Sequence, residues 1–202
     1  PLFSMGCGGD GEEKPADTQQ EQEEKDQVEE DEAGKLGAVL LIIAPTDFQD
    51  QEYETTRKVV EDAGYVVVVA SSTTDTAVGM DGTQVQPDIA LQDVDVGDYA
   101  AVAFIGGGGC TMYYNDADAL AIAEDAYDKG MTVGAICLAP GILATAGILQ
   151  GKEATVDPGG ITLLEENGAT FVDQDVVVDG KIVTACGPTA SEAFGEALVE
   201  NI

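Results

Sequence analysis

One cysteine stands where an apolar stretch meets a stretch with helical spacing. Residues 132–136 form an apolar run, Cys137 follows at once, and residues 138–148 favour a helix. A thiol on such a corner is exposed above a sheet and lies near helix N–H groups, which stabilise negative charge. The position therefore predicts a reactive thiolate. The simpler interpretation is a small apolar side chain in the core, because free cysteines are commonly buried.

Two further segments carry groups that suit such a thiol. Gly106–Gly109 follow another apolar run, and their backbone N–H groups are free to approach an anion. Glu52 lies near the start of the helical segment 50–64, shortly after the apolar run 37–44. The carboxyl ends of parallel strands meet at one edge of a sheet, where ligands bind. The sequence therefore predicts one pocket that holds a thiol, a carboxyl and backbone donors.

The elements that must position these groups alternate along the chain. Buried strands are predicted at 37–44, 65–71, 99–106, 132–137 and 153–156, and helices at 50–64, 114–130, 138–148 and 189–202. Residues 175–185 predict a β-hairpin with a type I′ turn at Asp179-Gly180, and Thr189 or Ser191 is the expected cap of the last helix. Alternating strands and helices are typical of a parallel sheet covered on both faces.

Four segments together resemble one known family. They are TDFQDQE (46–52), FIGGGG (104–109), AICLAPGILATAGILQGKEATV (135–156) and VVVDGKIVTACGPTAS (176–191). In this order they resemble the ThiJ/PfpI superfamily over about residues 37–202. The resemblance implies a flavodoxin-like α/β three-layer sandwich with a mostly parallel sheet and a C-terminal β-hairpin. It also implies a homodimer or a larger homo-oligomer.

The same resemblance implies roles for individual residues. Cys137 matches the nucleophile of the family, and Glu52 matches the acid that shares a hydrogen bond with it. Gly106, Gly107 and the N–H of Leu138 match the backbone donors of an oxyanion hole. Because two adjacent negative charges repel, Glu52 is expected to be protonated when Cys137 is a thiolate. We expect Glu52 to govern the chemistry of Cys137 rather than the stability of the fold.

The departures from the family are equally informative. Leu138 stands where members described as proteases carry histidine, and Asp157 replaces a second histidine of the deglycase branch. The chain has no histidine, so a Cys-His pair is impossible and peptidase activity is not expected. The remaining chemistry is a glyoxalase- or deglycase-like reaction on a small reactive carbonyl, by a lyase or hydrolase without a cofactor. The alternatives are a non-enzymatic redox-sensing stress protein and a cysteine/acid hydratase.

The other polar candidates near this pocket are less well defined. Cys110 is either a second, resolving thiol or a packed loop residue, and Cys186 falls at the pocket rim, with a structural role by default. Asp157 belongs to the same rim. Tyr113 and Tyr114 line either the pocket entrance or a subunit interface. Without histidine or a CxxC pair, no metal site is predicted.

The charge of the chain restricts its partners. The net charge is −31, and about −22 of it remains after residues 1–36 are set aside. Such a surface repels nucleic acid and suggests a high-salt, halophilic environment. Residues 1–36 predict a disordered acidic leader, in which Cys7 resembles a lipoprotein attachment site. With a lipid on Cys7 the protein would be extracytoplasmic and membrane-anchored, and otherwise cytoplasmic.

Overall fold

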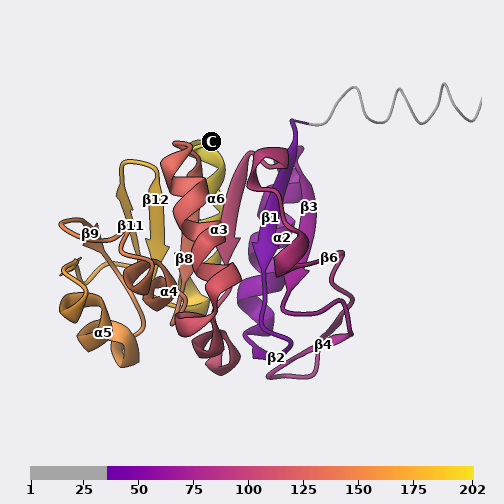
Figure 1. The fold of residues 1–202 in the computed structure, drawn as a ribbon, viewed down its shortest axis with the longest axis horizontal. Helices are drawn as coiled ribbons and strands as arrows, with labels where there is room; N and C mark the ends of the chain where they lie inside the picture. The colour runs from indigo at the N-terminus through magenta and orange to yellow at the C-terminus, as the bar shows by residue number, and fades with distance from the viewer. Residues whose placement is uncertain (1–35) are drawn as a thin grey trace, which may run out of the picture. The chain divides into compact units, whose positions relative to one another are not determined.

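A seven-stranded sheet forms the centre of the fold in the computed structural model, which describes residues 36–202 (Figure 1). Its strand order is β11-β12-β8-β7-β1-β3-β6. The parallel strands are β1 (Ala38–Ile42), β3 (Val66–Ser71), β6 (Ile89–Ala90), β7 (Ala101–Phe104), β8 (Thr132–Ile136) and β12 (Ile182–Ala185), and β11 (Val176–Asp179) is antiparallel. The predicted mostly parallel sheet with a C-terminal hairpin is thus confirmed.

Helices cover both faces of this sheet and complete three layers (Figure 1). One face packs against α3 (Ala117–Asp128), α4 (Pro140–Thr145) and α5 (Ile161–Glu166). The other face packs against α2 (Asp50–Asp62) and α6 (Ser191–Glu200). Because both faces are covered, the central strands are apolar at successive positions, as the buried run Val39 to Ile42 illustrates. Each fully buried Val, Leu or Ile side chain contributes about 1.5–3 kcal/mol.

Short elements border the central sheet. A three-stranded sheet joins β2 (Thr46–Phe48), β4 (Ala77–Gly79) and β5 (Gln84–Val85), and a two-stranded sheet joins β9 (Glu153–Ala154) and β10 (Thr170–Phe171). Five 3₁₀ turns complete the described elements: η1 (Leu91–Asp93), η2 (Val96–Asp98), η3 (Gly108–Asn115), η4 (Pro158–Gly160) and η5 (Pro188–Ala190). Part of the predicted strand 153–156 therefore forms a strand, β9. It lies outside the central sheet and pairs with β10.

Two local predictions were wrong. In the hairpin, Asp179 pairs with Ile182, and Gly180 alone has a positive φ among the turn residues. A type I′ turn needs two residues with positive φ, so this turn is of another type. At the start of α6, neither Thr189 nor Ser191 caps the helix, because the N-cap residue is Ala190. Ser191 is already inside the helix and donates its hydroxyl to Pro188 O.

Three predictions about the wider molecule lie beyond this structure. The acidic leader and the lipid site at Cys7 fall outside the described residues. The homo-oligomer implied by the family resemblance stays a prediction. Within residues 36–202, no helix is long and apolar enough to cross a membrane.

Candidate active site

Cys137 occupies a strained corner at the carboxyl end of β8. Its φ is +62°, a left-handed conformation that costs of order 1–3 kcal/mol for a residue other than glycine. Two hydrogen bonds hold this conformation: the Cys137 N–H donates to Ala185 O on β12 at 2.9 Å, and the Asp157 N–H donates to Cys137 O at 2.9 Å. The residue is only 8% exposed, so little of it contacts solvent. The positive φ places Cys137 on a sharp turn between β8 and α4, and its role as a nucleophile stays a prediction.

Glu52 lies in the first turn of α2 and is completely buried. The Gln49 side chain caps this helix by accepting from Glu52 N at 2.7 Å, and Gln49 N donates to Gly106 O at 3.0 Å. One carboxyl oxygen of Glu52, Oε2, accepts from Gly106 N at 3.0 Å. The other, Oε1, has no hydrogen-bond partner among the described residues. A buried carboxyl oxygen without a partner is costly, which is typical of a group that awaits a proton or a ligand.

Gly106 is the point at which the acid and the thiol meet. A Cβ built on Gly106 would lie 2.5 Å from Cys137 Cβ and 2.6 Å from Glu52 Oε2. It would also lie 2.7 Å from Ile136 O, a backbone atom that has little room to move. Any side chain at this position would therefore push the two groups apart. Gly107 is needed for a different reason, because its φ is +97°.

Burial is the main cause that raises the pKa values of both groups. Burial raises the pKa of Glu52 from 4.5 to about 7, although the Cys137 thiol and the Gly106 N–H oppose this rise. Burial, followed by the charge of Glu52, raises the pKa of Cys137 from 9.0 to about 12, and the Gly107 N–H opposes it. The two groups are coupled, so these values describe successive losses of protons from a pair. Above about pH 7 the pair retains one proton, and the higher pKa of Cys137 places it mainly on the sulfur.

The helix does not supply the donors that the sequence suggested. The N–H groups of Ala139, Gly141 and Ile142 bond to backbone carbonyls, and Pro140 has no N–H. The expected stabilisation of the thiolate by α4 is therefore wrong, and the raised pKa of Cys137 has the opposite direction. The Gly106 N–H is also occupied, since it donates to Glu52.

Two backbone donors remain for an oxyanion. The Gly107 N–H acts on the Cys137 sulfur, where it lowers the pKa of the thiol. The Leu138 N–H makes no hydrogen bond to another described residue, so it is free to donate. The predicted donor set is thus reduced from three N–H groups to two.

Sequence and structure comparisons identify the family. The pattern of the DJ-1/PfpI family matches residues 38–201. The chain belongs to the DJ-1/PfpI family. A crystal structure of a ThiJ/PfpI domain protein from Brachyspira murdochii superposes with a TM-score of 0.79 at 32% identity, over 83% of this chain and 97% of that one. The resemblance read from the sequence is confirmed.

Curated relatives within the DJ-1/PfpI family differ in how they are described. An uncharacterized protein of Methanocaldococcus jannaschii is 39% identical over 171 residues, 83% of each chain. A Pyrococcus abyssi protein named deglycase is 31% identical over 74% of this chain and 90% of its own. A Caenorhabditis elegans protein named glutathione-independent glyoxalase is 26% identical over 82% of this chain and 88% of its own.

The remaining candidate residues, Asp157, Cys186 and Cys110, differ in how they are placed relative to Cys137. Asp157 is bonded to the elbow through its N–H, and its charge raises the pKa values of both Cys137 and Glu52. Cys186 directly follows Ala185, the register partner of Ile136, so the two cysteines follow neighbouring strand ends. Its sulfur donates to Asp175 Oδ1 at 3.8 Å. Cys110 is completely buried, and burial raises its pKa further than its proximity to Cys137 does. All three described cysteines are free thiols.

Two residues position the site: Gln49, which sequence reasoning missed, and Tyr114, whose role it left open. Gln49 ties the first turn of α2 to the glycine loop through both its backbone and its side chain. The Tyr114 hydroxyl donates to Leu138 O at 2.8 Å, and its ring covers Gly141. Tyr114 therefore fixes the residue after the nucleophile. A tyrosine soon after a glycine loop was the only available signal, and it left the pocket and an interface as equal alternatives.

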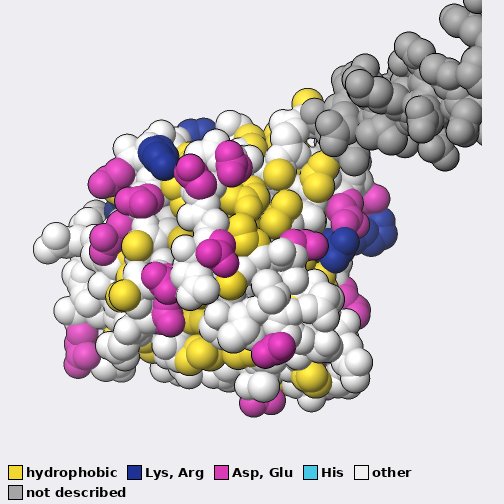
Figure 2. Space-filling view, turned by 45° about the vertical axis from the view of Figure 1, so that its right-hand side comes forward, with side chains coloured by type: hydrophobic (Ala, Val, Ile, Leu, Met, Phe, Trp, Pro, Cys, Tyr) yellow, Lys and Arg dark blue, Asp and Glu magenta, His cyan; other side chains and the backbone are white. Residues whose placement is uncertain are grey.

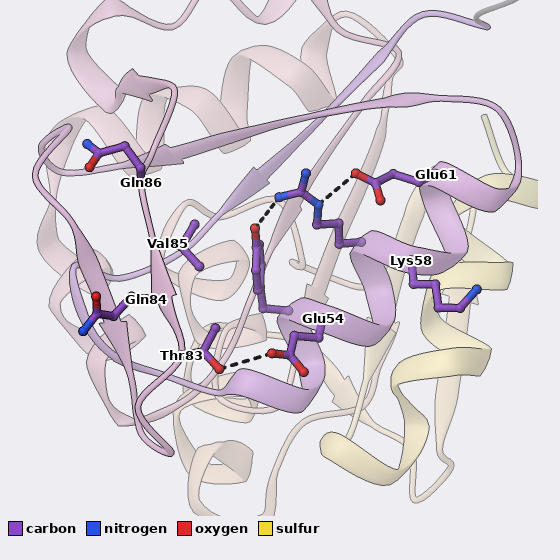
Figure 3. Close-up of a pocket in the computed structure, with 9 residues that line it drawn as sticks. Glu54, Lys58, Glu61, Thr83, Gln84, Val85 and Gln86 are labelled. Atoms are coloured by element: carbon purple, nitrogen blue, oxygen red, sulfur yellow. Dashed lines mark hydrogen bonds and ion pairs between the residues drawn. The ribbon is translucent and has the colours of Figure 1, made fainter.

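One surface depression lies away from this chemistry. It has a volume of about 400 Å³ and lies between α2 and the β4–β5 segment (Figure 3). There Arg57 donates to the Tyr53 hydroxyl at 2.7 Å and to Glu61 at 2.8 Å, while the Thr83 hydroxyl donates to Glu54 at 3.2 Å (Figure 3). Its charges are mutually neutralised, and Cys137 and Glu52 are not among its lining residues. Within residues 36–202, no group of three His, Cys, Asp or Glu side chains is arranged to hold a metal ion.

Proposed function

We propose that this protein converts small reactive carbonyl compounds through the Cys137 thiolate, in a glyoxalase- or deglycase-like reaction. One observation carries the proposal: a fully buried acid and a strained thiol meet at Gly106. Two relatives support it, since one is named deglycase and another glutathione-independent glyoxalase.

The proposed reaction of methylglyoxal begins with addition of the sulfur. The Cys137 thiolate attacks the aldehyde carbon, and the carbonyl oxygen takes a proton, which gives a hemithioacetal. Glu52, as the carboxylate, removes the hydrogen from that carbon, the hydroxyl proton passes to the neighbouring carbonyl oxygen, and the proton on Glu52 is returned to the neighbouring carbon. The product is a thioester of lactic acid. Water hydrolyses this thioester, so that methylglyoxal and water yield lactic acid and the free thiol. The N–H groups of Gly107 and Leu138 are suited to hold the negative oxygen during addition.

The site suits small substrates. Cys137 is 8% exposed and Glu52 is fully covered, so a folded or extended polypeptide does not reach the sulfur without rearrangement. The absence of histidine from the sequence points the same way, because no imidazole is available to activate the thiol or to protonate a leaving amine. We therefore do not propose peptidase activity.

Turnover by the purified chain tests this proposal. We expect methylglyoxal to be converted to lactate, and we expect Cys137→Ser and Glu52→Gln to lose this conversion. Glu54→Gln is the matched control, since Glu54 lies on the same helix but is exposed; it should convert methylglyoxal as the wild type does. Absence of lactate formation in the wild type refutes the proposal. If peroxide then converts Cys137 to a sulfinate, the redox-sensing alternative is favoured.

A further inference from the structure

Acidic groups surround the thiol at the carboxyl ends of β8 and β12. Asp157 is half-buried, its N–H binds Cys137 O at 2.9 Å, and its charge acts on both Cys137 and Glu52. Asp175 accepts the Cys186 thiol at 3.8 Å, next to the neighbouring strand end. Asp157 also raises the pKa of Cys186. The carboxylates therefore act on one small region.

Positive charge is absent from this region of the described structure. Residues 36–202 contain five basic side chains, and each is engaged elsewhere. Figure 2 shows the same imbalance on one face, where acidic side chains are spread widely and basic ones are few. The contacts of the five are Arg57 with Glu61, Lys58 with Asp62, Lys129 with Asp95, Lys152 with Asp179, and Lys181 with Asn201 O.

We infer that this site selects uncharged carbonyl substrates over anionic ones, and that Asp157 is the residue that determines this specificity. The excluded class comprises 2-oxo acids and phosphorylated carbonyl compounds, and the accepted class comprises neutral aldehydes and ketones such as methylglyoxal. The statement about carbonyl substrates rests on the proposed function. The underlying exclusion of anions from the thiol does not, and it is measurable without any turnover.

The physical reason is the accumulation of like charge. When the thiolate adds to a carbonyl, one negative charge passes to the oxygen beside Asp157 and the Glu52–Cys137 pair. A substrate carboxylate or phosphate would add a further negative charge a few ångströms away, with no cation to offset it. Such repulsion is strong in a partly buried site because water screens it incompletely. An uncharged substrate avoids it.

A pair of alkylating reagents measures this effect directly. Iodoacetamide is neutral and iodoacetate is anionic, and both attack the same thiolate, so the ratio of their rate constants is independent of the thiol pKa. The reaction of Cys137 is followed in its own tryptic peptide, residues 130–152, because Lys129 and Lys152 flank it. Cys110 and Cys186 fall in other peptides, 59–129 and 182–202. Relative to free cysteine in the same buffer, we expect Cys137 to prefer iodoacetamide by about tenfold.

Two variants assign the effect to one residue. Asp157→Asn keeps an oxygen that accepts from Gly159 N, as Asp157 Oδ1 does at 2.8 Å, and removes the charge. Asp128→Asn changes the net charge by the same amount as Asp157→Asn. Asp128 lies at the end of α3, just before β8 begins, and therefore at the amino ends of the strands, away from the thiol. We expect Asp157→Asn to abolish most of the tenfold preference and Asp128→Asn to keep it. A wild-type ratio equal to that of free cysteine, or equal shifts in both variants, would overturn the inference.

A second measurement connects this result with catalysis. The ratio of kcat/KM for methylglyoxal to that for 4,5-dioxopentanoate, a 2-oxoaldehyde that carries a carboxylate, should fall by about tenfold in Asp157→Asn and stay at the wild-type value in Asp128→Asn. If the wild type converts neither compound while the alkylation ratio behaves as expected, the proposed function fails and the exclusion of anions stands. If methylglyoxal is converted and the ratio is unchanged in Asp157→Asn, the proposed function stands and this inference fails.

Discussion

Replacing Glu52 with glutamine should change how the stability of the protein depends on pH. The carboxyl is completely buried, and its pKa rises from 4.5 to about 7 in the folded state. A carboxyl whose pKa is raised by folding holds its proton more tightly in the folded chain than in the unfolded one. Its ionisation therefore destabilises the fold, with no cost below pH 4.5 and the full cost above about pH 7.

The size of the effect follows from the two pKa values. At about 1.4 kcal/mol for each pH unit, a rise from 4.5 to about 7 corresponds to about 3 kcal/mol. The amide in the Glu52→Gln variant cannot ionise, so this pH-dependent cost disappears. The free energy of unfolding of the variant, relative to that of wild type, should increase by about 3 kcal/mol between pH 4.5 and about pH 8.

Denaturant unfolding at several pH values and fixed salt measures this difference. Because the other acids titrate in the same way in both proteins, the difference between the two free energies of unfolding at each pH reports on Glu52 alone. Glu54→Gln, on the same helix but exposed, should show no such pH-dependent difference. A Glu52→Gln difference that is the same at about pH 5 and about pH 8 would refute the raised pKa of Glu52.

The same variant reports on reactivity. In wild type, Cys137 alkylation should rise near pH 7, where the pair loses its first proton and a thiolate with a protonated Glu52 becomes available. In Glu52→Gln this step near pH 7 should vanish, because the amide cannot ionise and the thiol then titrates by itself. Glu52 therefore affects both chemistry and stability. The sequence-based expectation that it would leave stability unchanged treated the carboxyl as exposed, whereas Glu52 is completely buried.

Three further outcomes are expected. Gly106→Ala should destabilise the fold by about 1–3 kcal/mol and slow Cys137 alkylation, because its Cβ would lie 2.5 Å from Cys137 Cβ. In the control variant Gly108→Ala the new Cβ has no neighbour within 4 Å, so thermal unfolding should show a change of less than about 0.5 kcal/mol. An unstructured protein substrate should stay intact, and cleavage that is lost in Cys137→Ser would contradict the argument from the missing histidine. The melting temperature should rise from 0.01 M to 1 M salt, as the Debye length shortens from about 30 Å to 3 Å; a flat or falling curve would refute strong self-repulsion.

Much of the fold and the location of the site could be predicted from the sequence. Strands buried on both faces need continuous apolar runs, and such runs mark β1, β3, β7 and β8 along the chain. A cysteine directly after one run and glycines directly after another mark the strand ends that face the site. These are local properties, because burial and turn geometry restrict the residue types at each position of the chain.

Other features were decided only when distant segments packed together. The sequence placed Glu52 near a strand end, but only the contact between α2 and the glycine loop shows that Gly106 N–H is occupied by its carboxyl. The run 153–156 looked like a central strand, and only the tertiary structure shows that it pairs with β10 outside the central sheet.

The electrostatic character of the site is likewise a tertiary property. Asp157 lies twenty residues after Cys137, and its effect on the thiol depends on a backbone hydrogen bond that closes this separation. The sequence by itself determined which groups the chain has and which elements carry them: one thiol on a corner, many acids and no histidine. Their pKa values depend on burial and on distances between charges. Both arise only when the chain is packed, because solvent screens the same charges in the unfolded chain.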